Sequence, residues 1–407
     1  MNDVLATLKQ RAAARVDTLR PELEALSLDI HANPEIGFQE RASARKLTAM
    51  LGQHGFSVEQ GAGGLETAFR AEHHGGKGPT VAILGEYDAL PGVGHGCGHN
   101  LIGTAAVGAG LAIAAAAPEL PGRIQVIGTP AEEGGGGKVI LARAGVFDGV
   151  DAAMMFHPSR YTVGWRGSLA MVRVAVEFFG KAAHGASGLE KGINALEALI
   201  QTFVTVNGLR QHLRKDAIMH GIITDGGKAA NIVPDYASAE FSVRARDAAY
   251  RDQLVDKLRG CVKAAELATG ARGEVTLRMG YDNIVANSVM VDLFLQNLTS
   301  LGIELDDIDP FDKIGSTDMG DISQIVPAIH PYLKIADDSV SGHSTEFAAA
   351  AVSQVGQQAM ISAAKAMAMT CLDLFYCDGA LASARAEFEQ ALAEGRVRGR
   401  PSKVGMG

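Results

Sequence analysis

Cysteine is scarce in this sequence. Only four cysteines, at positions 97, 261, 371 and 377, occur among 407 residues, which excludes a framework of disulfides. Cys261, Cys371 and Cys377 lie in apolar, helix-like surroundings, so we predict that they pack as small core residues. Cys97 differs because it lies between glycines, two residues before a histidine. It is therefore the one cysteine with a candidate role in chemistry.

The sequence also has no excess of positive charge and no long apolar run. Lysine and arginine total 37 against 46 acidic residues, a formal net charge of −9, which argues against a nucleic-acid partner. The longest apolar stretch, around residues 111–117, is shorter than the ~20 residues that span a bilayer. The first residues alternate charged and apolar side chains and lack the apolar core of a signal peptide. We therefore expect a cytoplasmic protein without a membrane partner.

The spacing of apolar residues predicts an α/β catalytic domain. A helix is expected over about residues 5–19, and Pro21 is expected to begin a second helix. Short β-rich runs then alternate with helical stretches; the runs are residues 66–71, 80–84, 123–128 and 151–156. This alternation predicts a mostly parallel mixed sheet flanked by helices. Ligands bind such sheets at the loops that leave the carboxyl ends of the strands.

A different order of elements begins near residue 168. Strand and helix patterns follow in the order βαββαβ up to about residue 281, which predicts an inserted ferredoxin-like domain with its own two-layer core. The α/β pattern then resumes, and a long Ala- and Met-rich helix is expected to begin near His343. Because single cores rarely grow beyond about 250–300 residues, two domains are expected. We predict a catalytic domain of residues 1–167 and 282–407, interrupted by a domain of residues 168–281.

Four short segments carry residue types that bind metals. They are GHGCGHN (94–100), TPAEEGGGG (129–137), MFHP (155–158) and SGHSTEF (341–347). Cys97 and His99, two residues apart on an extended loop, point to the same side and can share a metal. His157 ends a buried apolar run, and His343 is expected at a helix start. Each of these residues alone is more often structural, but their occurrence together predicts a metal site.

Glu132 and Glu133 are adjacent in a stretch that is otherwise nearly uncharged. Hydrolysis at a two-metal site needs one carboxylate to hold metal and another to take a proton from water. A bound divalent cation lowers the pKa of water from about 15.7 to near 7. Mixed sulfur, nitrogen and oxygen ligands suit zinc, although manganese, cobalt and nickel also fit these ligand types.

At these residues the chain resembles the M20 metallopeptidase family, and most closely its D branch of amidohydrolases. The motifs that carry the resemblance follow in one order along the chain: HANPEIGFQE (31–40), GEYDALPGVGHGCGHN (85–100), GTPAEEGGGGKVILARAGVFDGVDA (128–152), KAAHGA (181–186), NIVPD (231–235), GSTDMGD (315–321) and SGHSTEF (341–347). The resemblance implies a metal-dependent hydrolase that cleaves the amide bond of small N-acyl amino acids or dipeptides with a free carboxylate.

One departure narrows the resemblance. Members that act on hippurate or auxin conjugates usually continue the Cys-x-His motif with aspartate and a second histidine, whereas this chain continues with Asn100 and Leu101. That feature is more similar to the branch of p-aminobenzoyl-glutamate hydrolase and Xaa-Arg dipeptidase. An aminoacylase for aromatic N-acyl amino acids stays an alternative.

The resemblance also implies roles for particular residues. Two divalent metal ions, zinc or manganese, would be held by Cys97, His99, Glu133, His157 and His343, with Glu132 as general base and acid. Asp88 and Asp318 would orient the loops of the metal site, although Asp318 equally suits the cap of a helix.

The resemblance further implies that the inserted domain is a lid through which the chain forms a homodimer. His184 would reach the substrate carbonyl, often from the partner subunit, and stabilise the oxyanion. Asn231 and Arg244 would bind the substrate carboxylate, a task that suits a planar guanidinium. Surface positions without a role are the alternative for His184 and Arg244.

Two other classes of function compete with a metal-dependent hydrolase. A metal-binding scaffold without catalysis would not need Glu132 beside a ligand, so this residue favours an enzyme. A thiol amidase would use Cys97 as nucleophile and His99 as base. Residues two apart on a loop are poorly placed for that proton transfer.

Overall fold

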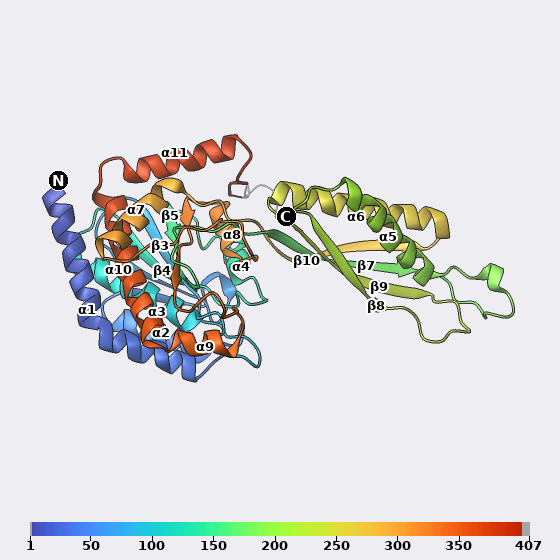
Figure 1. Ribbon diagram of the computed structural model, residues 1–407, viewed down its shortest axis with the longest axis horizontal. Helices are drawn as coiled ribbons and strands as arrows, with labels where there is room; N and C mark the ends of the chain where they lie inside the picture. The colour runs from blue at the N-terminus through green and yellow to red at the C-terminus, as the bar shows by residue number, and fades with distance from the viewer. Residues whose placement is uncertain (1, 401–407) are drawn as a thin grey trace. The chain divides into compact units, whose positions relative to one another are not determined.

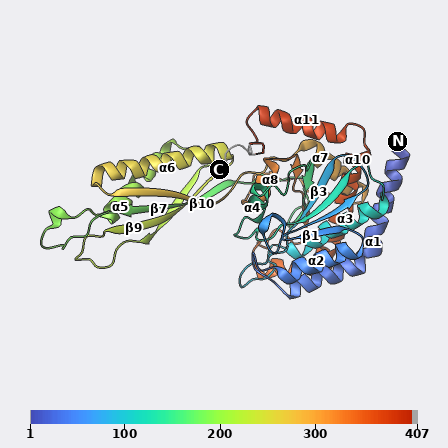
Figure 2. The same ribbon diagram turned by 180° about the vertical axis from the view of Figure 1, so that it is seen from behind.

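A computed structural model of the chain describes residues 2–400, which form two compact units (Figures 1 and 2). The first unit is made of the described parts of residues 1–167, 284–314 and 318–407. The second unit is made of residues 168–283 and 315–317. The second unit is therefore inserted into the sequence of the first.

A six-stranded mixed sheet forms the centre of the first unit. Its order is β1-β2-β4-β3-β5-β11, with strands at Ser57–Gln60, Phe69–His74, Arg123–Gly128, Thr80–Gly85, Ala152–Met154 and Ala328–Ile329. Strands β4, β3, β5 and β11 are parallel to one another, whereas β2 runs antiparallel to β4 and β1 antiparallel to β2. Two short strands, β6 (His157–Ser159) and β12 (Tyr332–Lys334), pair beside it. The predicted α/β fold is confirmed.

Helices flank this sheet. They are α1 (Asn2–Ala32), α2 (Arg41–Gln53), α3 (His99–Ala116), α4 (Gly137–Arg143), α7 (Ser288–Ser300), α8 (Met319–Ser323), α9 (Thr345–Ala351), α10 (Gln354–Tyr376) and α11 (Ala380–Ala393), with a short 3-10 turn at Ala62–Gly64. Helices α1, α3 and α10 pack against one another, and Figure 1 shows α10 beside α3. Small residues allow this close packing: a Cβ at Gly108 of α3 would lie 2.9 Å from Leu23 Cδ1.

Two of these helices, α3 and α10, are long and apolar enough to cross a membrane. Their apolar windows are 89% and 83% buried inside the unit, respectively. Such burial is typical of the core helices of a globular protein, which pass the same test of length and composition.

Pro21 does not begin a second helix, as the sequence had predicted, but lies inside α1. Val16 and Leu19 before the proline and Leu23 and Ile30 after it are all buried, so one apolar face continues past it. Each buried Leu, Ile or Val side chain contributes about 1.5–3 kcal/mol. Together they outweigh the ~3 kcal/mol that a proline costs inside a helix.

Two other expectations about elements are wrong. The long C-terminal helix expected from His343 is divided into α9 and α10, because Ser353 Oγ accepts a hydrogen bond from Gly356 N (3.1 Å) and caps a new helix. Cys377 is exposed rather than buried, because it follows the last residue of α10, whereas Cys261 and Cys371 are buried as predicted.

The second unit shows the element order βαββαβ. Its antiparallel sheet has the order β10-β7-β9-β8, with strands at Arg272–Tyr281, Ala170–Phe179, Tyr236–Ala245 and Ile218–Asp225. Helices α5 (Ala195–Leu209) and α6 (Ala248–Thr269) cover one face, and two 3-10 turns lie at Leu189–Lys191 and Arg210–His212. Every second residue of β9 is buried, which gives the sheet one covered face and one open face. Strand β8 lies at an edge.

Candidate metal centre

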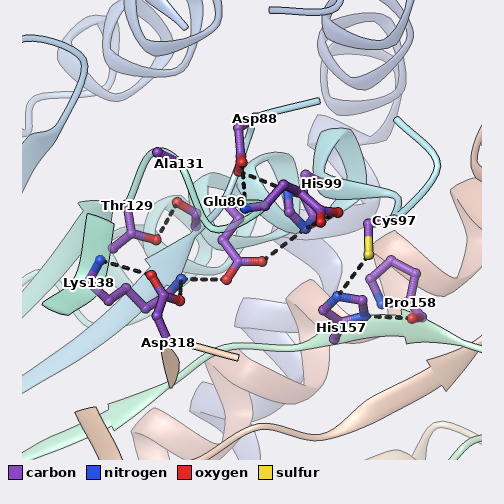
Figure 3. Close-up of polar contacts among 12 residues, drawn as sticks. Glu86, Asp88, Cys97, His99, Thr129, Ala131, Lys138, His157, Pro158 and Asp318 are labelled. Atoms are coloured by element: carbon purple, nitrogen blue, oxygen red, sulfur yellow. Dashed lines mark hydrogen bonds and ion pairs between the residues drawn. The ribbon is translucent and has the colours of Figure 1, made fainter. Parts of the chain in front are cut away.

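Three parallel strands bring the candidate ligands to one edge of the sheet. The segment after β3 carries Cys97 and leads into His99 at the start of α3. The segment after β4 carries the glutamate pair at 132 and 133, and His157 follows β5. Because the carboxyl ends of parallel strands meet at one edge, residues far apart in the sequence lie close together there. Figure 3 shows Cys97, His99 and His157 gathered at this edge.

All five residues predicted to bind metal come together. One donor atom each from Cys97, His99 and His157 lie within 4.8 Å of one another, and so do those of Cys97, Glu133 and His343. Cys97 Sγ is 3.8 Å from His157 Nε2. The two oxygens of Glu133 face different histidines, with Oε1 3.9 Å from His99 Nε2 and Oε2 3.6 Å from His343 Nε2. Glu133 thus lies between His99 and His343, where its carboxylate would help to hold metal.

The chemistry of these donors fits a metal ion. His99 Nε2 and Glu133 Oε1 are buried and have no hydrogen-bond partner among the described residues. A buried acceptor without a partner costs about 1–3 kcal/mol, and a bound cation would remove that cost. Burial lowers the pKa of His157 to about 4, so its imidazole is neutral at pH 7 and free to bind metal.

Asp88 holds two of the ligands in place. Its Oδ1 lies 2.9 Å from His99 Nδ1, and its Oδ2 accepts a hydrogen bond from Glu133 N at 2.9 Å. Asp88 itself is buried. A carboxylate that binds the far nitrogen of a histidine directs the near nitrogen toward a metal. This geometry suits the orienting role that the resemblance implies for Asp88.

The loop around Glu132 is held in an unusual conformation. Ala131, directly before it, has φ of +58°, a value that non-glycine residues rarely adopt, and its N–H donates to Glu40 Oε1 at 2.9 Å. His343 is likewise at φ +60°, and its N–H donates to Gly96 O. Strained backbone of this kind concentrates at functional sites, where the surrounding structure maintains it.

Glu132 lies beside the ligands. One donor atom each from His99, Glu132 and Glu133 lie within 4.8 Å of one another. Burial raises the pKa of the Glu132 carboxyl well above its ordinary value, and the charges of Glu86 and Asp318 raise it further. A carboxylate with a raised affinity for protons is suited to accept one from water.

Asp318 belongs to a buried ionic group that the sequence analysis did not identify. It stands at the N-cap position of α8, but its side chain makes no cap hydrogen bond. Instead Asp318 Oδ1 lies 2.8 Å from Lys138 Nζ, and Oδ2 accepts from Lys138 N at 3.0 Å. Lys138 also pairs with Glu86, as Figure 3 shows. The sequence holds a signal for burial of Glu86 and Lys138. Glu86 follows an apolar run and Lys138 follows a run of glycines, and neither run contains a charge.

His330 is a further residue missed in the sequence. It follows β11, is buried, and packs against His157 with ring centroids 5.4 Å apart. Its Nδ1 lies 3.0 Å from the hydroxyl of Tyr332. His330 and Tyr332 therefore hold the ring of a candidate ligand in place from one side.

The other predicted site residues lie in the second unit and are not all together. His184 and Asn231 are neighbours, since His184 pairs with Ile232 and Gly185 N donates to Asn231 O at 2.9 Å. Arg244 is at the opposite end of β9. The eight steps along the strand from Tyr236 to Arg244 span roughly 26 Å at about 3.3 Å each. Asn231 and Arg244 therefore cannot bind one carboxylate from within a single chain.

Comparison with known proteins identifies the family. Residues 82–366 match the model of peptidase family M20/M25/M40. The chain is 37% identical to Xaa-Arg dipeptidase of Mus musculus, covering 96% of this chain and 94% of that protein. It is 28% identical to one of the subunits of p-aminobenzoyl-glutamate hydrolase from Escherichia coli (strain K12), covering 88% and 90%.

A solved structure agrees with this assignment. A Bacillus subtilis protein, described as a dinuclear metal binding peptidase from the M20 family, superposes with a TM-score of 0.70 at 21% identity. The match covers 88% of this chain and 99% of that protein, which shows the shared fold. The resemblance predicted from the motifs is confirmed: the chain belongs to peptidase family M20/M25/M40.

Proposed function

We propose that this protein is a metal-dependent hydrolase that cleaves the amide bond of small N-acyl amino acids or dipeptides carrying a free carboxylate. One observation carries the proposal: five donor side chains from four segments of the chain converge, with Glu132 beside them. The names of the relatives, Xaa-Arg dipeptidase and p-aminobenzoyl-glutamate hydrolase, support this substrate class.

The residues of the site divide the chemistry among them. Cys97, His99, Glu133, His157 and His343 would hold two divalent cations, zinc or manganese. When bound, such ions lower the pKa of water and polarise the carbonyl of the amide. Glu132 accepts a proton from the attacking water and donates it to the departing amine. General acid–base catalysis of this kind contributes about 10²–10⁴-fold in rate.

A second copy of the chain completes the substrate site in this proposal. Asn231 precedes the start of β9 and Arg244 lies near its other end, so a carboxylate bound by both would need one residue from each subunit. His184, which neighbours Asn231, would then reach the substrate carbonyl from the same partner. The open edge strand β8 supports a dimer, because Ile222 and Ile223 are 67% and 45% exposed on it.

The alternative of a thiol amidase has little support. Burial raises the pKa of the Cys97 thiol, whereas a nucleophilic cysteine needs a lowered pKa. A metal-binding scaffold without catalysis would leave Glu132 without a task. Both alternatives give different results in a metal-removal experiment.

The experiment is a hydrolysis screen of metal-loaded, chelator-treated and reloaded protein. The substrates are Xaa-Arg and other dipeptides, p-aminobenzoyl-glutamate, and aromatic N-acyl amino acids. We expect hydrolysis that disappears with the metal and returns with zinc or manganese. Activity that survives metal removal would favour the thiol amidase, and a metal-loaded protein inert toward every substrate would favour the scaffold.

A further inference from the structure

A buried ionic group lies directly behind the metal ligands. Glu86, Lys138 and Asp318 are each 0% exposed. Fully buried lysine is rare, because taking a charged group out of water costs several kcal/mol. Lys138 Nζ pairs with Glu86 Oε1 and Asp318 Oδ1, so each carboxylate uses one oxygen to balance the ammonium.

The second oxygen of Asp318 is used, but that of Glu86 is not. Asp318 Oδ2 accepts the hydrogen bond from Lys138 N. Glu86 Oε2 is buried and has no hydrogen-bond partner within residues 2–400. It lies 3.3 Å from His99 Nε2, which is also buried and lacks a hydrogen-bond partner in that range. This oxygen of Glu86 is therefore aimed at a candidate metal ligand.

The contacts of the His99 ring leave one nitrogen to face Glu86. His99 Nδ1 lies 2.9 Å from Asp88 Oδ1, and a carboxylate can only accept, so the Nδ1 N–H donates to Asp88. The other ring nitrogen, Nε2, faces Glu86 Oε2 at 3.3 Å. An imidazole nitrogen and a carboxylate oxygen are both ligand types that bind divalent cations.

The spacing of these two atoms fits a shared cation. Two donors at about 2.0 Å from a tetrahedral zinc ion lie about 3.3 Å apart. The observed separation of His99 Nε2 and Glu86 Oε2 is also 3.3 Å. Lys138 fixes the Glu86 carboxylate in this position without occupying the oxygen that faces His99.

We propose that Glu86 is an additional metal ligand of this centre, that it shares a cation with His99, and that Lys138 is the residue that positions it. The proposal rests on the proposed function, because it requires the metal centre described above. It extends the ligand set by a carboxylate that follows β3, the strand whose loop also supplies Asp88 and Cys97.

Two variants separate a metal ligand from a structural ion pair. Glu86→Gln and Asp318→Asn each remove one of the two carboxylates that balance Lys138, at equal burial. Only Glu86 has an oxygen that faces His99. Metal binding is measured by competition with a chromogenic chelator, and the cobalt-substituted proteins are compared by their visible absorption spectra.

We expect Glu86→Gln to weaken the affinity for one ion by at least about tenfold and to change the cobalt spectrum. The metal affinity of Asp318→Asn should stay within about threefold of that of wild type. Equal losses in both variants, or none in Glu86→Gln, would overturn the proposal. Should Glu86→Gln fail to fold, a crystal structure of the zinc-loaded wild type decides. A distance of about 2.2 Å or less between Glu86 Oε2 and an ion would support the proposal, and a distance beyond about 3 Å would overturn it. A wild type that binds no metal would instead overturn the proposed function as well.

Discussion

The two adjacent glutamates at one strand end face different surroundings. Glu133 directs one oxygen toward His99 and the other toward His343. Glu132 lies beside the buried carboxylates of Glu86 and Asp318. Burial and the charges of these two residues raise the pKa of Glu132. Ala131, directly before the pair, has φ of +58°.

Replacing Glu132 with glutamine tests its role as base. The change keeps the shape of the side chain and removes the ability to accept a proton. We expect kcat to fall by about 10²–10⁴-fold or more, while metal content measured by elemental analysis stays near that of wild type. Unchanged turnover would remove Glu132 from its assigned role.

Replacing His343 with alanine tests a ligand that the sequence had placed at a helix start. The structure places it before α9, with its side chain 59% exposed and Nε2 3.6 Å from Glu133. We expect a loss of bound metal in His343→Ala. His74→Ala is the matched control, because His74 is a similarly exposed histidine, at 53%, that lies outside the site. Full metal content in both variants would exclude His343 as a ligand.

At the scale of elements, the sequence predicts where the strands end, and therefore where the site lies. It does not predict which charged residues pair over long distances in the chain. Buried runs such as residues 80–84 and 123–128 are followed by polar or glycine-rich segments, a local pattern that locates the site. The contact between Lys138 and Glu86 joins residues 52 positions apart, and nothing in either local sequence specifies the partner. The prediction that Pro21 begins a new helix was wrong, because α1 is kept continuous by the packing of its apolar face against α3 and α10.

Helix α2 illustrates how an element beside the site is held at its start. Glu35 accepts hydrogen bonds from Ala42 N (3.0 Å) and Ser43 N (2.8 Å), donors that the first turn of a helix leaves free. Partial burial raises the pKa of Glu35, but these hydrogen bonds outweigh it and the pKa lies below its ordinary value.

Glu35→Gln should therefore reduce the free energy of unfolding by about 1 kcal/mol at neutral pH. Because the folded pKa is lowered, the stabilisation is present above the unfolded pKa and is lost as pH falls through the folded value. The difference between wild type and variant in denaturant melts should shrink as the pH is lowered toward that range. Glu66→Gln, which removes an exposed partner of Arg41 on the same helix, should have the smaller effect. An equal effect of both variants would contradict the capping role.

At the scale of the whole molecule, the proposed substrate site needs residues from two chains. Asn231 precedes β9 and Arg244 lies near its far end, so in the proposed function the two residues that bind a carboxylate come from different chains. The exposed isoleucines of β8 give the second unit an edge on which another copy can pack.

Mixing two inactive variants tests this arrangement. His184→Ala and Glu132→Gln each disable a different part of the site, and a mixed dimer retains one site with both parts intact if His184 acts across the interface. We expect partial recovery of activity when the two are refolded together. Verified mixed dimers without activity would show that His184 serves its own chain.

The most direct test of the metal centre is a crystal structure of zinc- or manganese-loaded protein with anomalous difference maps. The account predicts two peaks about 3.5–4 Å apart, within bonding distance of Cys97, His99, Glu133, His157 and His343. Maps without a peak among these five side chains, in protein whose metal content is verified, would contradict it.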